Sequence, residues 1–306
     1  CNRAGHSGVI TMLEDQVVRE INALNQRGGR MLSMVDLLLA GTVDLKLAAY
    51  LMGAIRQGAS VLCCAGPGGT GKTTLLGALL GFLPRQGVIK VVEKAEPLKW
   101  YTEQSDPELS TWFVCHELGP GPWYSYLWGE GARSFLSMPH GGRFCATTVH
   151  ADDLGELRRL LLGSEIALSA EDFSRLDLII FIRVIRVQGA MRWQRRVTQV
   201  HVGTGDPRST HRPVCRWDAN TDKFVWQEDG EPLSPVPTDV TVGSGSTSGS
   251  RSWLPSWGLR TARPKWDGGK SGPARQSNQD FLRHLQDKRI LALEDVRREV
   301  LRFYET

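Results

Sequence analysis

The stretch VLCCAGPGGTGKTTLLGALLG, residues 61–81, decides the fold class of this 306-residue chain. It contains the full pattern G-x-x-x-x-G-K-[ST], placed between a short apolar run and a leucine-rich segment. Glycines allow backbone N–H groups to turn toward a phosphate without Cβ clashes, and a helix that starts there adds its positive dipole end. An ordinary glycine-rich turn is the alternative, but motif and context together predict a nucleotide phosphate site.

The motif predicts which of its polar residues bind ATP and Mg²⁺. Lys72 is expected to reach the β- and γ-phosphates, and the Thr73 hydroxyl is expected to coordinate Mg²⁺. The predicted nucleotide-binding residues are Gly66, Pro67, Gly68, Gly69, Thr70, Gly71, Lys72, Thr73 and Thr74. Kinases, GTPases, transporters and motors all use such a loop, so the motif alone does not fix what the phosphate energy is used for.

The chain after this loop alternates strand-like apolar runs with helical segments. The further predicted strands are residues 87–96, 111–117, 142–150, 177–187, 191–204 and 213–227. Helical segments are predicted near 129–138 and 153–163. This alternation predicts an α/β domain around a mostly parallel sheet.

Helical segments flank this domain at both ends. The sequence predicts a helical N-terminal segment (1–42), a P-loop domain (43–230), a flexible linker rich in Pro, Gly and Ser (231–278), and a C-terminal pair of helices (279–306). Because the sequence begins at Cys1 and not at Met, we expect that its natural start lies further upstream.

Hydrolysis of ATP needs a carboxylate near Mg²⁺ or near the attacking water, usually just beyond an apolar strand. The run WFVCHE ends at Glu117, which is predicted to orient the water and to approach the metal through water. Glu93 and Glu96 end the preceding strand as a second acidic pair, and His150 closes ATTVHA, where an imidazole could sense the γ-phosphate. The alternatives are capping or surface roles for the glutamates and a structural role for His150.

The composition bounds the class of protein. The chain is 41% hydrophobic, and no apolar run approaches the roughly 20 residues of a membrane-spanning helix. Six cysteines without a C-x-x-C pair are expected to be buried, reduced thiols rather than metal ligands or disulfides.

Residues 251–306 carry 12 lysines and arginines against 7 acidic residues, and tryptophans lie among the basic residues of the first part of this tail. We interpret the part of this tail that contains Trp253, Trp257 and Trp266 as a solvated linker; contact with a membrane surface or with nucleic-acid bases is the alternative.

These motifs, in this order, resemble the ATPases that power type II secretion, type IV secretion, and the assembly of type IV pili or archaella. Residues 33–84 resemble that family's approach to its Walker A motif, and VIKVVEKAEPL (88–98) resembles its acidic Asp box. FVCHELG (113–119) resembles the Walker B segment, and GGRFCATTVHADDLGELRRLLLG (141–163) resembles the His box and the helix after it. RRVTQVHVG (195–203) and the C-terminal helices are similar to the end of archaeal-type, N-terminally short members.

The resemblance implies a RecA-like ATPase domain in a ring, usually a hexamer, that docks on a polytopic membrane platform protein. It implies a cytoplasmic protein, peripheral on the inner face of the cell membrane, with nucleic acid an unlikely partner. Carried over by position, Lys72 and Thr73 bind phosphate and Mg²⁺, Glu117 orients water, Glu93 or Glu96 assists, and His150 senses the γ-phosphate.

Two other interpretations stay open. The family places arginines between the Asp box and Walker B, where they complete the neighbouring subunit's site, but this chain has no arginine between Glu96 and Glu117. An arginine finger contributes about 10³–10⁵ in rate, so a nucleotide-binding regulatory subunit with little hydrolysis is one alternative. Arg27, Arg30, Arg133 and Arg143 are the predicted replacements. A nucleic-acid-processing ATPase is the other alternative, supported by the basic tail.

Overall fold

The computed structural model describes residues 16–25, 28–66, 68–94, 109–139, 142–185, 193–227 and 272–305. Within these ranges the strands form a nine-stranded sheet. They are β1 (Val61–Cys64), β2 (Gly87–Val91), β3 (Ser110–Leu118), β4 (Tyr126–Leu127), β5 (Arg143–Val149), β6 (Leu178–Ile185), β7 (Gln194–Gly203), β8 (His211–Asp218) and β9 (Lys223–Trp226). The labelled helices are α2 (Met34–Leu39), α3 (Leu45–Arg56), α4 (Lys72–Leu80), α6 (Gly129–Leu136), α7 (Leu154–Leu162), α8 (Ala170–Ser174), α9 (Gly272–Asp287) and α10 (Leu293–Phe303).

The sheet is largely parallel, as predicted. Strands β2, β3, β5, β1 and β6 are neighbours in this order and run parallel. Strands β7, β8 and β9 continue the sheet in antiparallel pairs, and β4 pairs in parallel with the end of β3. Because the carboxyl ends of parallel strands meet at one edge, the loops that follow β1, β3 and β5 converge there.

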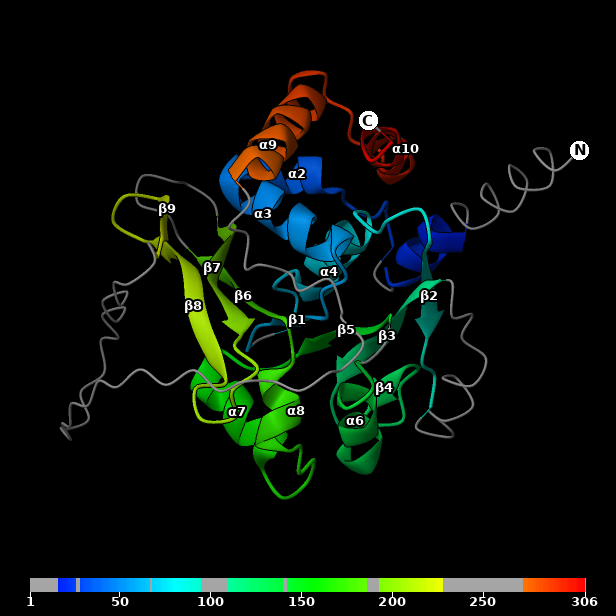
Figure 1. The fold of residues 1–306 in the computed structure, drawn as a ribbon, viewed down its shortest axis with the longest axis vertical. Helices are drawn as coiled ribbons and strands as arrows, with labels where there is room; N and C mark the ends of the chain where they lie inside the picture. The colour runs from blue at the N-terminus through cyan, green and yellow to red at the C-terminus, as the bar shows by residue number, and fades with distance from the viewer. Residues whose placement is uncertain are drawn as a thin grey trace, which may run out of the picture.

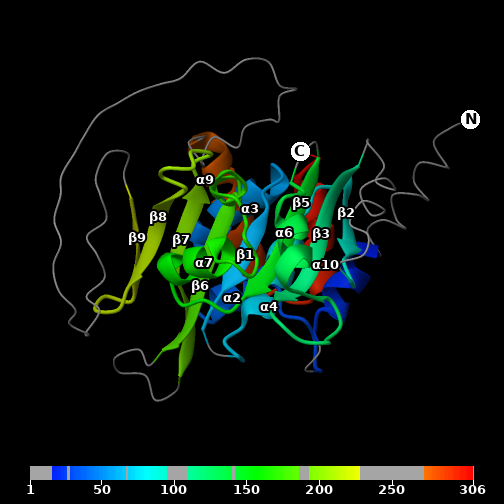
Figure 2. The ribbon, with the colours of Figure 1, turned by 90° about the horizontal axis from the view of Figure 1, so that it is seen from below.

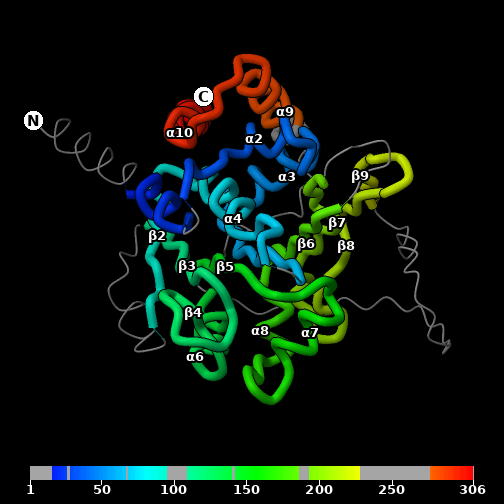
Figure 3. Tube along the Cα trace, turned by 180° about the vertical axis from the view of Figure 1, so that it is seen from behind, coloured from blue at the N-terminus to red at the C-terminus, as the bar shows by residue number. Residues whose placement is uncertain are grey.

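Helices cover both faces of this sheet, which confirms the α/β class. Helices α2, α3, α4 and α9 lie on one face, and α6, α7 and α8 lie on the other (Figures 1 and 3). Figure 2 looks onto the face that carries α6 and α7. A strand that is buried on both faces must be apolar throughout, and this explains why β1 reads VLCC without a polar residue.

The side chains of β1 show how the two layers share the sheet. Val61 and Cys63 join the core formed with α3 and α4, while Leu62 and Cys64 join a second core under α6 and α7. Successive strand residues point to opposite faces, so each core receives every other residue of the strand. The strand that carries the phosphate loop is therefore fixed from both sides.

The element bounds differ from the sequence predictions at a few places. Strand β2 ends at Val91 rather than near residue 96, and the polar Glu93 that follows is exposed. The predicted strand 213–227 is two strands, β8 and β9, because the chain turns at Asp222, which has a φ of 51°. The two elements that were not predicted, β4 and α8, are too short to show a periodic pattern.

The C-terminal pair of helices packs against the face that carries α3 and α4. Helix α9 begins at Gly272, earlier than expected, and the chain breaks before α10 near Arg289, which has a φ of 51°. The predicted boundaries of the four parts stay predictions. Residues 231–271 of the predicted linker, with the tryptophans within it, lie outside the described residues, and residues 272–278 belong to α9.

One buried cation joins α10 to the end of α4. The Arg297 side chain donates hydrogen bonds to the carbonyls of Gly81 (3.4 Å), Leu83 and Pro84 (3.3 Å), and the residue is 2% exposed. The last carbonyls of a helix have no intrahelical partner and carry the negative end of its dipole. Arg297 therefore caps the helix whose opposite end follows the phosphate loop.

Replacing Arg297 by Met is expected to lower the free energy of unfolding by about 3 kcal/mol, because buried carbonyls would lose charge-assisted hydrogen bonds. Arg298→Met is the matched control, since Arg298 is exposed and pairs with Asp295 one turn earlier (2.7 Å). The control should cost less than about 1 kcal/mol. Urea unfolding of both variants measures the difference, and equal losses in the two variants would contradict the capping role.

Two histidines of neighbouring strands are withdrawn from water: His201 of β7 is buried, and His211 of β8 is half-buried. Burial lowers the pKa of His201 to about 4 and that of His211 to about 4. His201 packs edge-on against Phe181, and the His211 Nε2–H donates to the Leu176 carbonyl (3.0 Å). Below the unfolded-state pKa of about 6.5, the unfolded chain binds protons that the folded chain excludes, so stability falls as the pH drops toward 4.

We expect each of these histidines to remove up to about 1.4 kcal/mol of unfolding free energy per pH unit below about pH 6.5. Urea midpoints measured at about pH 7, 6 and 5 test this, because unperturbed carboxylates, with pKa values near 4, stay ionised in that window. The variant His201→Gln should show a shallower dependence. A midpoint that stays constant from pH 7 to 5 would contradict the assignment.

The burial predicted for the cysteines is confirmed for the five that the structure describes. Cys63, Cys64, Cys115, Cys145 and Cys215 are free and buried. Burial raises the pKa of Cys115 to about 12 and raises those of Cys63 and Cys64 further above the ordinary thiol value. Across the described ranges, no helix has the length and apolar character required to cross a membrane.

Candidate functional site

The phosphate loop joins the end of β1 to the start of α4. Gly69 and Gly71 have φ values of 79° and 105°, a region that other residues rarely adopt. Gly71 is the N-cap of α4, so the helix begins at Lys72. The backbone amides of a helix's first turn have no intrahelical acceptor, and here they belong to Lys72, Thr73 and Thr74. The local geometry is that of an anion-binding helix N-terminus.

A side chain at the first glycine of the motif would meet a neighbouring carboxylate. The Gly66 amide donates to Asp152 Oδ1 (3.0 Å), and a Cβ on Gly66 would lie 2.2 Å from Asp152 Oδ2. Asp152 therefore occupies the space that any side chain at position 66 would need. It comes from the turn after β5, two residues beyond His150.

Glu117 lies near the end of β3, where the pairing with β5 is irregular. The β3–β5 register shifts between Cys115 and Leu118, and β4 pairs alongside through Glu117 and Tyr126. The Thr148 hydroxyl donates to the His116 carbonyl (2.7 Å), which fixes the backbone next to Glu117. Bulges near functional sites commonly re-aim one side chain, and this one accompanies the turn of Glu117 toward the loop after β1.

His150 follows β5, the strand that lies between β1 and β3 in the sheet. Its Nδ1 contacts the Gly66 carbonyl, and its Nε2 lies 3.2 Å from Glu117 Oε1. The imidazole thus bridges the phosphate loop and the carboxylate at the end of β3.

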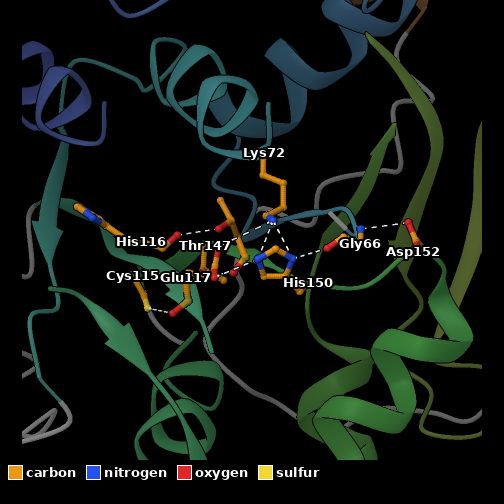
Figure 4. A network of polar contacts seen from close by, with 9 residues as sticks. Gly66, Lys72, Cys115, His116, Glu117, Thr147, His150 and Asp152 are labelled. Atoms are coloured by element: carbon orange, nitrogen blue, oxygen red, sulfur yellow. Dashed lines mark hydrogen bonds and ion pairs between the residues drawn. The ribbon is translucent and has the colours of Figure 1, made fainter. Parts of the chain in front are cut away.

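The three predicted residues Lys72, Glu117 and His150 meet at one point (Figure 4). Lys72 Nζ lies 3.2 Å from His150 Nδ1 and 3.8 Å from Glu117 Oε2. Lys72 is 5% exposed, while the side chains of Glu117 and His150 are 17% and 43% exposed. A buried ammonium, a carboxylate and an imidazole therefore face one another beside the N-terminus of α4.

The other predicted site residues are not part of the cluster formed by Lys72, Glu117 and His150. Glu93 is exposed after β2, and its carboxylate accepts a hydrogen bond from the Tyr124 hydroxyl (3.1 Å). Pro67 and Glu96 lie outside the described residues. Thr73 and Thr74 are half-buried in the first turn of α4, and the metal-ligand role of Thr73 stays a prediction. The assisting role of Glu93 or Glu96 stays a prediction.

The sequence analysis did not single out three residues that contact the loop or its supports. They are Asp152, which binds Gly66; Arg183, whose Nη2 donates to the Asp152 carbonyl (3.0 Å); and Arg195, which donates to the Gly69 and Thr70 carbonyls. Asp152 lies in the quoted segment TTVHADD and Arg195 in RRVTQVHVG. Both segments contributed to the resemblance, so a signal was present, but spacing alone does not reveal contacts between distant strands.

The arginines that the sequence analysis offered as replacements lie elsewhere or are outside the description. Arg30 donates to the Asp36 carboxylate (2.8 Å) near the N-terminal helices. Arg143 starts β5, at the sheet edge opposite the phosphate loop, because β5 runs parallel to β1. Arg133 lies on α6, and Arg27 is outside the described residues. Arg143 is therefore not placed to replace an arginine finger in its own subunit.

Comparisons with known proteins give partial likenesses. No protein-family model matches the sequence, and no curated protein matches it. Among solved structures, the VirB11 ATPase of the Brucella suis type IV secretion system in complex with sulphate is 19% identical, with a TM-score of 0.39 over 58% of this chain and 56% of that one. The Legionella pneumophila ATPase DotB is 14% identical, with a TM-score of 0.38 over 55% of this chain and 56% of that one. The chain spans about half the length of each of these proteins.

Proposed function

We propose that this chain binds Mg²⁺-ATP at the loop between β1 and α4 and hydrolyses it. The observation that supports this is the meeting of Lys72, Glu117 and His150 next to a helix N-terminus, from three neighbouring strands. Lys72 Nζ lies within 3.8 Å of both partners. Together the three side chains supply a cation for the phosphate oxygens, a carboxylate that can orient the water, and an imidazole near the terminal phosphate.

In this proposal each residue acts on one part of the substrate. The amides of the loop and of the first turn of α4 hold the phosphate chain, and Lys72 neutralises charge on its oxygens. Glu117 orients the attacking water and takes up its proton, and His150 contacts the γ-phosphate. The Thr73 hydroxyl, an oxygen ligand of the kind Mg²⁺ prefers, would hold the metal, which supplies further charge neutralisation.

We also propose that the chain is a motor subunit of a secretion or type IV pilus-like assembly system. The order of its motifs supports this proposal: phosphate loop, acidic strand end, Glu117 and the TTVHADD segment. In that setting the subunits form a hexameric ring in the cytoplasm, and the ring docks on a polytopic membrane platform protein. Closure of the subunits on ATP then drives movement of the partner.

A regulatory subunit with little hydrolysis is the second candidate function. The sequence supports it, since no arginine lies between Glu96 and Glu117. The two candidates share the nucleotide site and differ in turnover.

ATP turnover by the purified chain tests the proposal. We expect Mg²⁺-dependent phosphate release whose rate per subunit increases with protein concentration, because subunits assemble into a ring. We also expect the molecular mass, measured by light scattering, to increase when nucleotide is added. Binding of ATP without turnover, at any concentration, would favour the regulatory subunit. Stimulation by single-stranded DNA would favour a nucleic-acid motor instead.

A further inference from the structure

Arg195 reaches the phosphate loop from β7, a strand far away in sequence. Its Nε donates to the Thr70 carbonyl (3.1 Å), and its Nη2 donates to the Gly69 carbonyl (3.2 Å). Its Cδ also lies 3.3 Å from the position that a Cβ on Gly71 would take. One planar guanidinium therefore contacts two consecutive carbonyls of the loop.

These two carbonyls determine where two amides point. In a trans peptide unit the C=O of one residue and the N–H of the next point in opposite directions. A donor that holds the Gly69 and Thr70 carbonyls on the outside of the loop therefore directs the N–H groups of Thr70 and Gly71 to its inside. The inside of such a loop is where backbone amides bind the phosphates of a nucleotide.

The first half of the loop is held in a different way. His150 contacts the Gly66 carbonyl, and Asp152 accepts from the Gly66 amide. Arg183 of β6 in turn donates to the Asp152 carbonyl (3.0 Å). The strand pair β6–β7 thus supports the loop at two places: Arg183 acts on Gly66 indirectly, through Asp152, and Arg195 binds the Gly69 and Thr70 carbonyls directly.

We propose that Arg195 is a positioning residue for the phosphate chain: it pre-orients the amides of Thr70 and Gly71, and it does so in the same subunit. This inference rests on the proposed function. The guanidinium suits the task because its donors lie in one rigid plane, whereas a lysine ammonium is a point charge that cannot hold two carbonyls in a fixed relation. Arg195 binds the loop carbonyls and not the reacting atoms. Its replacement should therefore change the affinity for the nucleotide rather than kcat.

The experiment compares Arg195→Gln and Arg195→Lys with the wild type and with Arg212→Gln. Arg212 of β8 pairs with Val202 and is the matched control, because Val202 lies roughly 23 Å along β7 from Arg195 at about 3.3 Å per residue. Calorimetry measures the affinities for ADP and for a non-hydrolysable ATP analogue, and steady-state kinetics measures kcat and KM. Because Arg195 is exposed, its variants are expected to fold, and their melting temperatures verify this.

We expect both Arg195 variants to bind ADP and the ATP analogue about tenfold more weakly, by the same factor for each nucleotide. KM for ATP should rise accordingly while kcat at saturation stays within about threefold, the pattern of an interaction made equally in the ground and transition states. Arg212→Gln should match the wild type.

Two results would overturn the inference. Unchanged ADP affinity with a large fall in kcat would mean that Arg195 acts on the γ-phosphate as an arginine finger. Full recovery of nucleotide affinity in Arg195→Lys would mean that the positive charge at position 195 is sufficient and that the two hydrogen bonds to the loop carbonyls are not needed. A failure of the proposed function is distinguishable from both, because then the wild-type chain itself would bind ADP no better than Lys72→Ala does.

Discussion

Replacing Glu117 by glutamine is expected to leave ATP bound but to slow its hydrolysis by about 10²- to 10⁴-fold. Glutamine keeps the size and one oxygen of glutamate, but it cannot accept the proton of the attacking water. Glu117 Oε1 lies 3.2 Å from His150, and Oε2 lies 3.8 Å from Lys72, so the carboxylate already faces the two residues that we propose contact the terminal phosphate. Phosphate release and equilibrium binding of ATP, measured on the same preparation, separate the two effects.

Glu130→Gln is the control for that change. Glu130 is an exposed residue in the first turn of α6, and its substitution should alter neither binding nor turnover. If Glu117→Gln hydrolysed ATP at the wild-type rate, Glu117 would not be the group that activates water.

Replacing Lys72 by alanine is expected to weaken ATP binding by about 10²-fold or more. Lys72 is 5% exposed, and a charge-assisted hydrogen bond to a phosphate in so buried a place contributes much more than one at the surface. At ATP concentrations near 100 times the wild-type Kd, bound nucleotide should stabilise the wild-type chain by about 2.7 kcal/mol. The variant should lose most of this stabilisation, which is measured as the rise in melting temperature with Mg²⁺-ATP.

Lys223→Ala provides the comparison, because Lys223 is exposed at the start of β9. It should retain the full rise in melting temperature. A Lys72→Ala chain that is still stabilised by ATP like the wild type would place the nucleotide elsewhere.

The predictions that the structure confirms are those that depend on local pattern. The alternation of apolar and helical runs predicted the parallel sheet, and the apolar run VLCC before the loop is a strand of that sheet. The pattern G-x-x-x-x-G-K-[ST] carries its own geometry, since Gly69 and Gly71 adopt positive φ values and α4 begins at Lys72. The meeting of Glu117 and His150 with Lys72 followed from a simple rule, that parallel strands end at the same edge.

What the sequence analysis missed depends on contacts between distant segments. Arg195 lies more than a hundred residues from Thr70, and no periodicity connects a strand residue to a loop carbonyl. The same is true of Arg297, which caps α4 from the last helix. Strand β4 was not predicted, because two residues are too few to show a periodic pattern. Its pairing with β3 nevertheless helps to position the backbone at Glu117.

A crystal structure of the chain with Mg²⁺ and a non-hydrolysable ATP analogue would show where the terminal phosphate lies. We expect the γ-phosphate within hydrogen-bonding distance of Lys72 Nζ and the His150 ring, and a water bound to Glu117 in line with the scissile bond. A γ-phosphate that lies away from both Glu117 and His150 would contradict this expectation.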